Sequence, residues 1–349
     1  MTQIDSENRL GPDGPVMCRS CRAPVSWNPD IAALDCEYCG DTTAVSAPPL
    51  PPARPLATAD APTNEAAAAH LGQVRCGRCG ARALLEPPVV AGPCTFCGAP
   101  TAVESEADCT LSPDGIAPFT VPRAQVEIAL RRWLGASFFA PNDVASLARV
   151  EALTPVYMPC WSFDEVRVKG SWRAEKFRPL QEDNGEVVTG KIDTTYRDFY
   201  PVYAGTGLPP DDWRLVLSGD DEAVSGYHPG FLKGQAAEAA SRSAAECVDD
   251  LPPIIEGRIE PDYKPERSYS FKVMGLEVEA VSCRQVLLPL WIAVFHYRGK
   301  LYRCLVGGHS GLVHGEAPTS GFKVTLAVVG FTILSVLLIL VLAVNCPSA

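Results

Sequence analysis

The pattern of apolar and polar positions changes along the chain, and each change predicts a different kind of element. Between residues 155 and 315, stretches such as VRVKGSW and LEVEAVS are apolar at every second position, which is typical of strands with one buried face. After Pro122 the spacing becomes that of a helix, which is expected to end near Gly135. The apolar residues on the expected helix face are Val126, Ala129, Leu130, Trp133 and Leu134.

Two more helices are expected in this region. The stretch PNDVASLARVEAL predicts a short helix capped by Asn142. An alanine-rich stretch predicts another from about Gln235 to Val248. Together with the strands, these helices predict an α+β body over residues 112–316 that is mainly β.

The longest apolar run lies at the end of the sequence. Val324 to Val344 is 21 residues without a charge, a proline or an amide. At 1.5 Å per residue, such a helix crosses a hydrocarbon core about 30 Å thick. The alternative is a buried core helix, which rarely has apolar residues on every face over such a length. The run therefore predicts one transmembrane helix over residues 324–344, which acts as a tail anchor.

Two stretches of the body resemble each other. MPCWSFDEVRVKGSW and LPLWIAVFHYRGKLY align so that Trp161 corresponds to Trp291 at an offset of 130 residues, and a proline precedes each tryptophan by two positions. Each copy predicts a strand pair with its tryptophan in the core. We expect the two copies to pack about a pseudo-twofold axis.

A four-cysteine pattern occurs twice in the first hundred residues. Each copy reads C-x2-C-x14-C-x2-C, and one constant offset relates the two. We assign residues 16–45 to a first ribbon and residues 73–103 to a second. The candidate ligands are Cys18, Cys21, Cys36 and Cys39 in the first ribbon and Cys76, Cys79, Cys94 and Cys97 in the second.

Four thiolates at this spacing match a closed, tetrahedral metal site. Two intervening residues let both cysteines of a pair reach one ion, and the longer insert suits a strand pair. Gly40, Gly80 and Gly98 each follow a cysteine pair, where a positive φ is often required. We expect two structural Zn²⁺ ions. A rubredoxin-like iron site, which uses the same ligands, remains an alternative to zinc. Disulfide pairing of the cysteines is a second alternative.

The charge of the chain limits its partners. The formal net charge is −11, and residues 1–110 contain seven arginines, no lysine and thirteen acidic residues. Such a surface does not favour phosphate binding, so the ribbons are expected to contact proteins rather than nucleic acid. The first 15 residues lack the features of a signal peptide and are expected to be disordered. A proline- and alanine-rich linker is expected over residues 46–72.

No group of residues in the sequence predicts an enzyme. Cys160 has no histidine near it in the sequence, and a buried cysteine beside a core tryptophan is the simpler interpretation. His309 and His314 read as a turn residue and a strand residue. If the body did carry an active site, Cys160, Asp164 and His309 would be the residues to test.

The chain resembles bacterial zinc-ribbon membrane proteins that carry labels such as primosomal protein N′-like and replication restart helicase-like. The stretches that carry the resemblance are the CxxCG ribbon, IAPFTVPRAQVEIALRRWL, FFAPNDV, TPVYMPCWSFD, LPLWIAVFHYRGKLYRCLVGGHSGLVHGEAP and the terminal apolar run. A helicase needs a G-x-x-x-x-G-K-[ST] loop, and this sequence has none. The resemblance implies an adaptor that works beside phage-shock-type or SPFH-type membrane-stress proteins. This chain departs from it in carrying two ribbons, and in having VGGHSG where relatives have an Asn-Gly-x-x-Gly turn.

These expectations combine into one hypothesis. The chain is a single-pass protein of the cell membrane, held in the bilayer by its C-terminal helix, with its ribbons and body in the cytoplasm, where thiols stay reduced. It recruits partner proteins to the membrane surface and is not an enzyme. The alternative is a membrane-tethered zinc-ribbon protein that binds nucleic acid.

Overall fold

The computed structural model describes most of the chain. The described residues are 9–10, 17–60, 69–76, 81–85, 92–94, 96, 100–101, 105–111, 113–136, 138–144, 149–176, 186–209, 212–214, 217, 223–233 and 235–345. Side chains of α6 are described as far as Val336.

Short strands form most of the N-terminal region, and three long strands dominate the rest. The early strands are β1 (Arg9–Leu10), β2 (Ser26–Asn28), β3 (Ala33–Asp35), β4 (Thr42–Val45), β5 (Arg54–Pro55), β6 (Ala69–Arg75), β7 (Arg82–Leu85), β8 (Gly92–Pro93), β9 (Pro100–Thr101), β10 (Ser105–Leu111) and β11 (Gly115–Ile116). The later strands are β12 (Arg149–Lys176), β13 (Val187–Tyr203), β14 (Ser225–Gly226), β15 (Ala236–Glu238), β16 (Tyr269–Tyr297), β17 (Lys300–Gly307) and β18 (Val313–Gly315). The helices are α1 (Arg123–Ala136), α4 (Ala244–Cys247), α5 (Leu251–Tyr263) and α6 (Gly321–Asn345), with 3₁₀ turns η1 (Leu56–Thr58), η3 (Pro229–Leu232) and η4 (Val248–Asp250).

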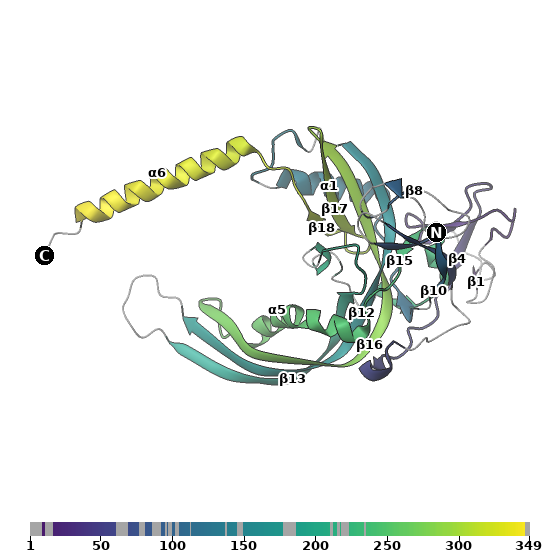
Figure 1. Cartoon of the computed structure of the whole chain (residues 1–349), viewed down its shortest axis with the longest axis horizontal. Helices are drawn as coiled ribbons and strands as arrows, with labels where there is room; N and C mark the ends of the chain where they lie inside the picture. Colours follow the sequence, from purple (N-terminus) through teal and green to yellow (C-terminus); the bar gives the residue numbers. More distant parts are fainter. Residues whose placement is uncertain are drawn as a thin grey trace, which may run out of the picture.

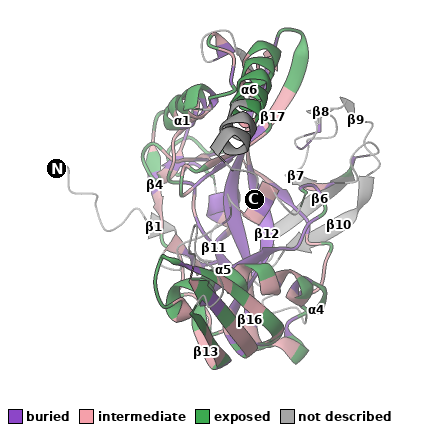
Figure 2. Cartoon of the chain, turned by 90° about the vertical axis from the view of Figure 1, so that its left-hand side faces the viewer, coloured by how far each residue is buried: buried purple, intermediate pink, exposed green. Residues whose placement is uncertain are grey.

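Twelve of the described strands belong to one sheet, which curls through the whole body (Figure 1). Its centre is the antiparallel pair of β12 and β16, and Figure 2 shows the buried middle of these strands inside the molecule. β13 extends β12 on one side, and β17 extends β16 on the other. β15 and β11 are short strands that pair in parallel with β12 and β16.

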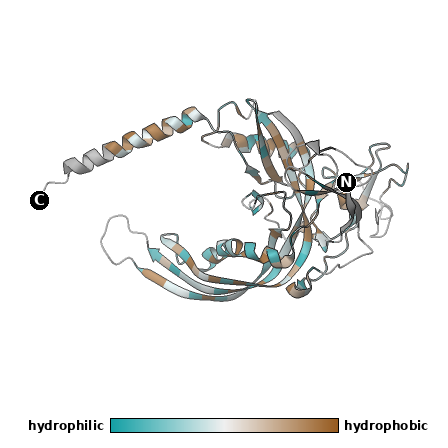
Figure 3. Ribbon diagram, in the orientation of Figure 1, coloured by the Kyte–Doolittle hydropathy of each residue, from teal (hydrophilic) through white to brown (hydrophobic). Residues whose placement is uncertain are grey.

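The far ends of β12, β13 and β16 form a curved arm, and α5 packs on its inner face (Figure 1). The register of the β12–β16 pairing shifts at several points, for example between Lys169 and Ser171 of β12. These irregularities bend the strands. Apolar and polar residues alternate along the arm, as Figure 3 shows, because only one face is covered. The helix contributes Leu251, Ile255 and Ile259 to the buried contact.

A local twofold relates the two halves of the body. In the β12–β16 ladder Met158 lies opposite Leu288, and these residues are also equivalent at the offset of 130 that relates Trp161 to Trp291. A rotation about this pair therefore exchanges the two strands. This register confirms the expected pseudo-twofold packing of the two repeats.

The backbone contacts beside the axis repeat as well. The amide of Ala204, at the end of β13, donates to the carbonyl of Pro159 at 2.8 Å. The amide of Gly308, at the end of β17, donates to the carbonyl of Pro289 at the same distance. The carbonyl of Ala204, and likewise that of Gly308, accepts hydrogen bonds from two consecutive backbone amides. In each half these amides belong to the segment that leads into a helix. The donors are Ser241 and Arg242 in one half and Thr120 and Val121 in the other.

The two repeated tryptophans hold these helix entries in place. The indole N–H of Trp161 donates to the carbonyl of Arg242 at 3.2 Å, and that of Trp291 donates to the carbonyl of Val121 at 3.1 Å. Both side chains are buried. Each half of the body thus consists of a short parallel strand, a helical segment, a long strand and its antiparallel partner.

Each cysteine unit packs into a different core. Cys18, Val25, Trp27, Leu34 and Cys36 of the first unit belong to the cluster that surrounds Trp291. The second cluster surrounds Trp161 and includes Cys76, Ala81, Cys94 and Phe96 of the second unit. Strands β6 and β7 of the second unit also join the large sheet, because β7 pairs with β15, whereas β8 and β9 pair only with each other.

The proline-rich segment after the first unit lies against the body. The amide of Gly226 donates to the carbonyl of Pro48, and a Cβ on Gly226 would lie 2.6 Å from the carbonyl oxygen of Pro49. Further along, β5 pairs with Ser282 and Cys283 of β16. We call residues 48–60 the strap. It ends where Asp60 accepts the amide of Ala244.

The helix predictions have mixed outcomes. α1 is confirmed, with Val126, Leu130 and Leu134 buried. The helix expected from Gln235 is wrong in its first half, since β15 occupies that stretch and α4 begins only after Ser243, which caps it. The helix predicted after Asn142 was expected to include Arg149 and the residues after it. This part of the prediction is wrong, because β12 begins at Arg149. Of residues 1–15, Arg9 and Leu10 pair with β4, and the others lie outside the described residues.

The predicted fold class is corrected in two respects. The structure is mainly β, and one curled sheet contains strands of both the second cysteine unit and the body, whereas two separate ribbons beside an α+β body were expected. Among the residues whose side chains are described, no helix is both long enough and apolar enough to cross a membrane. The predictions of a tail anchor, of a single-pass transmembrane protein and of its cell-membrane localisation are therefore wrong.

Candidate metal centre

The first cysteine unit brings all four of its thiols together. Cys18 and Cys21 precede β2, and Cys36 and Cys39 stand between β3 and β4. The antiparallel pairing of β2 with β3 returns the chain, so the second cysteine pair lies beside the first. This confirms the expected use of the insert as a strand pair.

The spacing of the sulfur atoms suits one tetrahedral ion. The Sγ atoms of Cys18 and Cys39 are 3.5 Å apart, as are those of Cys21 and Cys36, and all four lie within 4.8 Å of one another. Four sulfurs at 2.3 Å from a central ion would be separated by about 3.8 Å. All four cysteines are free thiols in this structure. The unit is therefore a group that can hold a metal ion.

Backbone amides point at the sulfurs. The N–H of Cys21 lowers the pKa of the Cys18 thiol to about 7, because it stabilises the thiolate. The N–H of Asp41 acts in the same direction on Cys39, but the neighbouring sulfurs of Cys18 and Cys21 raise the pKa of Cys39 to about 12. Four thiols this close cannot all ionise without a cation among them. The arrangement thus favours a bound metal.

Both cysteine pairs end in the same backbone conformation. Gly40 follows Cys39 with φ of 72°, which confirms the positive φ expected there. Arg22 follows Cys21 with φ of 63°, although it is not glycine. The left-handed conformation lets each turn close, and it costs a residue with a Cβ about 1–2 kcal/mol.

The site lies at the edge of the ribbon. Cys18 and Cys36 are buried, whereas Cys21 and Cys39 are exposed. The hydroxyl of Ser20 donates to the carboxylate of Asp41 at 2.7 Å and links the two turns. No position of the set is left for a substrate, so a metal held here is structural.

The second cysteine unit is only partly described. Cys76 and Cys94 are buried in the same core cluster, and the amide of Cys76 donates to the carbonyl of Ala81. Cys79, Cys97 and the glycines after them, Gly80 and Gly98, lie outside the described residues.

The aromatic residues of the two units have different roles. Trp27 is buried against Phe231, with ring centroids 4.8 Å apart, and its indole N–H donates to the carbonyl of Phe119 at 3.3 Å. Phe96 is buried beside Gly207. Tyr38, between Cys36 and Cys39, is 78% exposed. Trp27 and Phe96 therefore attach the units to the body, while Tyr38 faces outward.

Cys160, Asp164 and His309 each have other partners. Cys160 is fully buried, and desolvation raises the pKa of its thiol well above the usual range. Asp164 pairs with Arg284, and its other oxygen accepts the hydroxyl of Ser162. The ring of His309 bonds Thr120 at 3.0 Å.

A buried carboxyl group also lies in the body, and sequence reasoning missed it. Glu238 of β15 is fully buried and accepts the Tyr203 hydroxyl and the amides of Thr206 and Gly207. Desolvation raises its pKa to about 7. Its partners are 31 to 35 residues away in the sequence, and no local pattern predicts such a contact. Because every described contact of Glu238 is a bond within the core, we treat this group as structural.

Comparison with known proteins gives a distant match. No family model matches the chain, and no solved structure matches it significantly. The uncharacterized protein YdjG of Bacillus subtilis (strain 168) is 24% identical over 229 residues. The match covers 61% of this chain and 66% of that protein, so the chain spans just under two thirds of the length of the relative. Identity at this level indicates a distant relationship and assigns no activity.

Proposed function

We propose that this protein is a zinc-ribbon adaptor that presents its first ribbon to partner proteins. The observation that carries the proposal is the group of four thiols within 4.8 Å, set in a ribbon that Trp27 fastens to the body. A closed metal site stabilises a small fold without providing chemistry. A ribbon fixed on a large body is suited to binding, and the protein is proposed not to be an enzyme.

Zinc is the proposed metal at both cysteine units. Four thiolates bind zinc or iron, and we favour zinc because no motif in the sequence indicates electron transfer. The same sequence pattern assigns a second zinc to Cys76, Cys79, Cys94 and Cys97. Metal analysis of freshly prepared, reduced protein is expected to give two zinc ions per chain, and iron in their place would refute the choice of metal.

The partner is proposed to be a protein because the first ribbon exposes large apolar side chains. Tyr38, Ile31 and Met17 are exposed large apolar residues on this small unit. Aromatic side chains of this kind often anchor protein interfaces. The charged residues of the ribbon do not favour phosphate binding. They are Arg19 and Arg22 against Asp30, Asp35, Glu37 and Asp41. By the resemblance of the sequence, the partners are proposed to be phage-shock-type or SPFH-type proteins.

The test measures binding of the full chain to a purified phage-shock-type or SPFH-type protein. Tyr38→Ser should weaken binding about tenfold or more if Tyr38 anchors the interface. Met274→Ser serves as the matched control, since Met274 is an exposed apolar residue on the arm. Equal affinities for the two variants would contradict a role for Tyr38. Tight, salt-dependent binding of DNA or RNA would favour the nucleic-acid alternative.

A further inference from the structure

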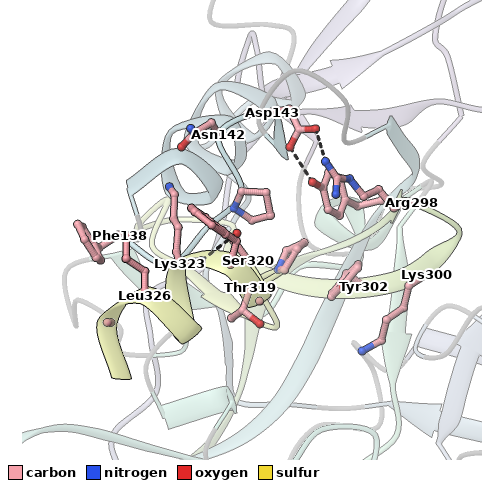
Figure 4. A pocket seen from close by; sticks show the side chains of 16 residues that line it. Phe138, Asn142, Asp143, Arg298, Lys300, Tyr302, Thr319, Ser320, Lys323 and Leu326 are labelled. Atoms are coloured by element: carbon pink, nitrogen blue, oxygen red, sulfur yellow. Dashed lines mark hydrogen bonds and ion pairs between the residues drawn. The ribbon is translucent and has the colours of Figure 1, made fainter. Parts of the chain in front are cut away.

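A large open cavity lies where α6 leaves the body (Figure 4). Its volume is about 1010 Å³, at the upper end of the size range for small-molecule sites. Three segments line it, namely residues 138–143 after α1, the hairpin of β16 and β17 from 297 to 302, and residues 318–327 at the start of α6. The cavity is far from the cysteine units in the sequence, and the adaptor proposal does not use it.

The cavity is positively charged although the protein is acidic. Its lining contains Arg298, Lys300 and Lys323 but a single carboxylate, that of Asp143. Asp143 binds the guanidinium of Arg298 at 2.7 Å, which neutralises one of the cations. This leaves an excess of positive charge in a chain whose formal net charge is −11.

The two lysines keep their charge available. The amine of Lys323 donates to the carbonyl of Ala140 at 2.7 Å, which is a neutral partner. The amine of Lys300 lies 5.2 Å from the centre of the Tyr302 ring. The ion pairs within the described part of the chain include neither lysine. An anion in the cavity would therefore not have to displace a carboxylate.

Apolar side chains occupy the other side of the cavity. Phe138 is 77% exposed and Leu326 is 61% exposed, and Figure 4 shows both at the side opposite Lys300 and Arg298. Thr319 and Ser320 lie between the two sides. The cavity thus offers the charge of Lys300 at one side, and at the other side exposed hydrocarbon beside the amine of Lys323.

We propose that this cavity binds a single-chain anionic amphiphile, whose phosphate or carboxylate head lies near Lys300 and whose hydrocarbon tail covers Phe138 and Leu326. The head gains from the excess positive charge, and the tail gains from leaving water. A small anion without a tail would leave the apolar side uncovered, and a cationic amphiphile would meet repulsion.

The test is calorimetric titration of the full chain with dodecyl phosphate below its micelle concentration. Saturable binding of one molecule per chain is expected. Ethyl phosphate, which lacks the tail, and dodecyltrimethylammonium, which has the same tail and the opposite charge, should bind at least tenfold more weakly. Vesicles of phosphatidylglycerol distinguish a free amphiphile from a bilayer, and binding to vesicles without binding of the free molecule would overturn the proposal.

Variants locate the site. Lys300→Gln should weaken binding about threefold to fivefold, as expected for one partly exposed charge pair, and added salt should reduce this difference. Leu326→Gln should weaken the binding of dodecyl phosphate, and ethyl phosphate should bind both proteins equally weakly. Lys191→Gln is the control, since Lys191 is an exposed lysine on the arm. If Lys191→Gln weakened binding as much as Lys300→Gln does, the proposal would be wrong. It would also be wrong if ethyl phosphate bound as tightly as dodecyl phosphate.

Discussion

Tyr203 donates its hydroxyl hydrogen bond to the carboxyl group of Glu238 inside the core. Glu238 also accepts the amides of Thr206 and Gly207, so one side chain fixes the whole turn after β13. Gly207 lies directly against Phe96 of the second cysteine unit. The bonds of this carboxyl group therefore position the surface on which that unit rests.

The buried carboxyl group predicts a pH dependence of stability. Desolvation raises the pKa of Glu238 from 4.5 to about 7 in the folded protein. Between these values the folded state binds more protons than the unfolded state, so the free energy of unfolding should fall as pH rises from about 4.5 to 7, and then level off. The protonation of Glu238 should change the free energy of unfolding by about 3 kcal/mol over this pH range.

Denaturant titrations at several pH values test this contribution. Glu238→Gln should remove the fall across that range, while Glu256→Gln, an exposed residue of α5, should leave it in place. An unchanged pH slope in Glu238→Gln would show that the carboxyl group does not hold its proton in the folded state.

The twofold predicts that Trp161 and Trp291 contribute equally to the free energy of unfolding. Replacing either with Phe keeps most of the buried ring but removes the hydrogen bond to a backbone carbonyl. Each variant should lose about 1–2 kcal/mol of unfolding free energy. Trp172→Phe is the comparison, because Trp172 stacks on Phe271 at the arm and its indole makes no hydrogen bond that the structure describes. A large loss in only one of the two variants would contradict the equivalence.

The turn residues of the first ribbon predict opposite effects of two substitutions. Arg22→Gly relieves a left-handed conformation and should tighten metal binding by an amount equivalent to about 1 kcal/mol. Gly40→Ala places a Cβ in the same left-handed conformation and should weaken metal binding by about 1–2 kcal/mol. Competition with a zinc chelator measures both, because folding of so small a unit is coupled to its metal. Changes of the same sign in the two variants would refute the explanation.

Metal removal should be visible through Trp27. This side chain is only 5% exposed in the docked ribbon. A chelator should unfold the ribbon and expose the indole, which shifts its fluorescence to longer wavelength. Trp27→Phe should lack the shift, and Cys36→Ser should show the shifted emission before any chelator is added. If the metal leaves without a change in emission, the ribbon stays docked without its ion.

The sequence predicts those parts of the structure that depend on local spacing. The cysteine pairs, the strand pair between them, the positive φ of Gly40 and the buried face of α1 follow from distances of a few residues. The twofold was also predictable, because Trp161 and Trp291 with their prolines recur at a fixed offset. Each of these features repeats a pattern whose physical cause lies nearby in the chain.

Features that depend on distant partners were not predictable. The acceptor of the Trp27 indole is the carbonyl of Phe119, 92 residues away, so nothing near Trp27 indicates that it docks the ribbon. The alanine-rich stretch at Ala236 has helical propensity, but its place between β7 and β12 makes it a strand. The partners of Glu238 come together only when the sheet has formed.

The strap sets the geometry of any two-point contact. It is fastened at Gly226, along β16 and at Ala244, so the first ribbon is not a module on a loose tether. A flexible linker would let two ribbons reach sites at many separations, whereas a rigid connection accepts one separation and one orientation. If the proposed adaptor bound one partner through both ribbons, a partner whose two sites matched that span would gain the full benefit of double attachment, and a partner with any other spacing would be held by one ribbon at a time. Selection among partners would then depend on their internal dimensions as well as on the chemistry of their surfaces.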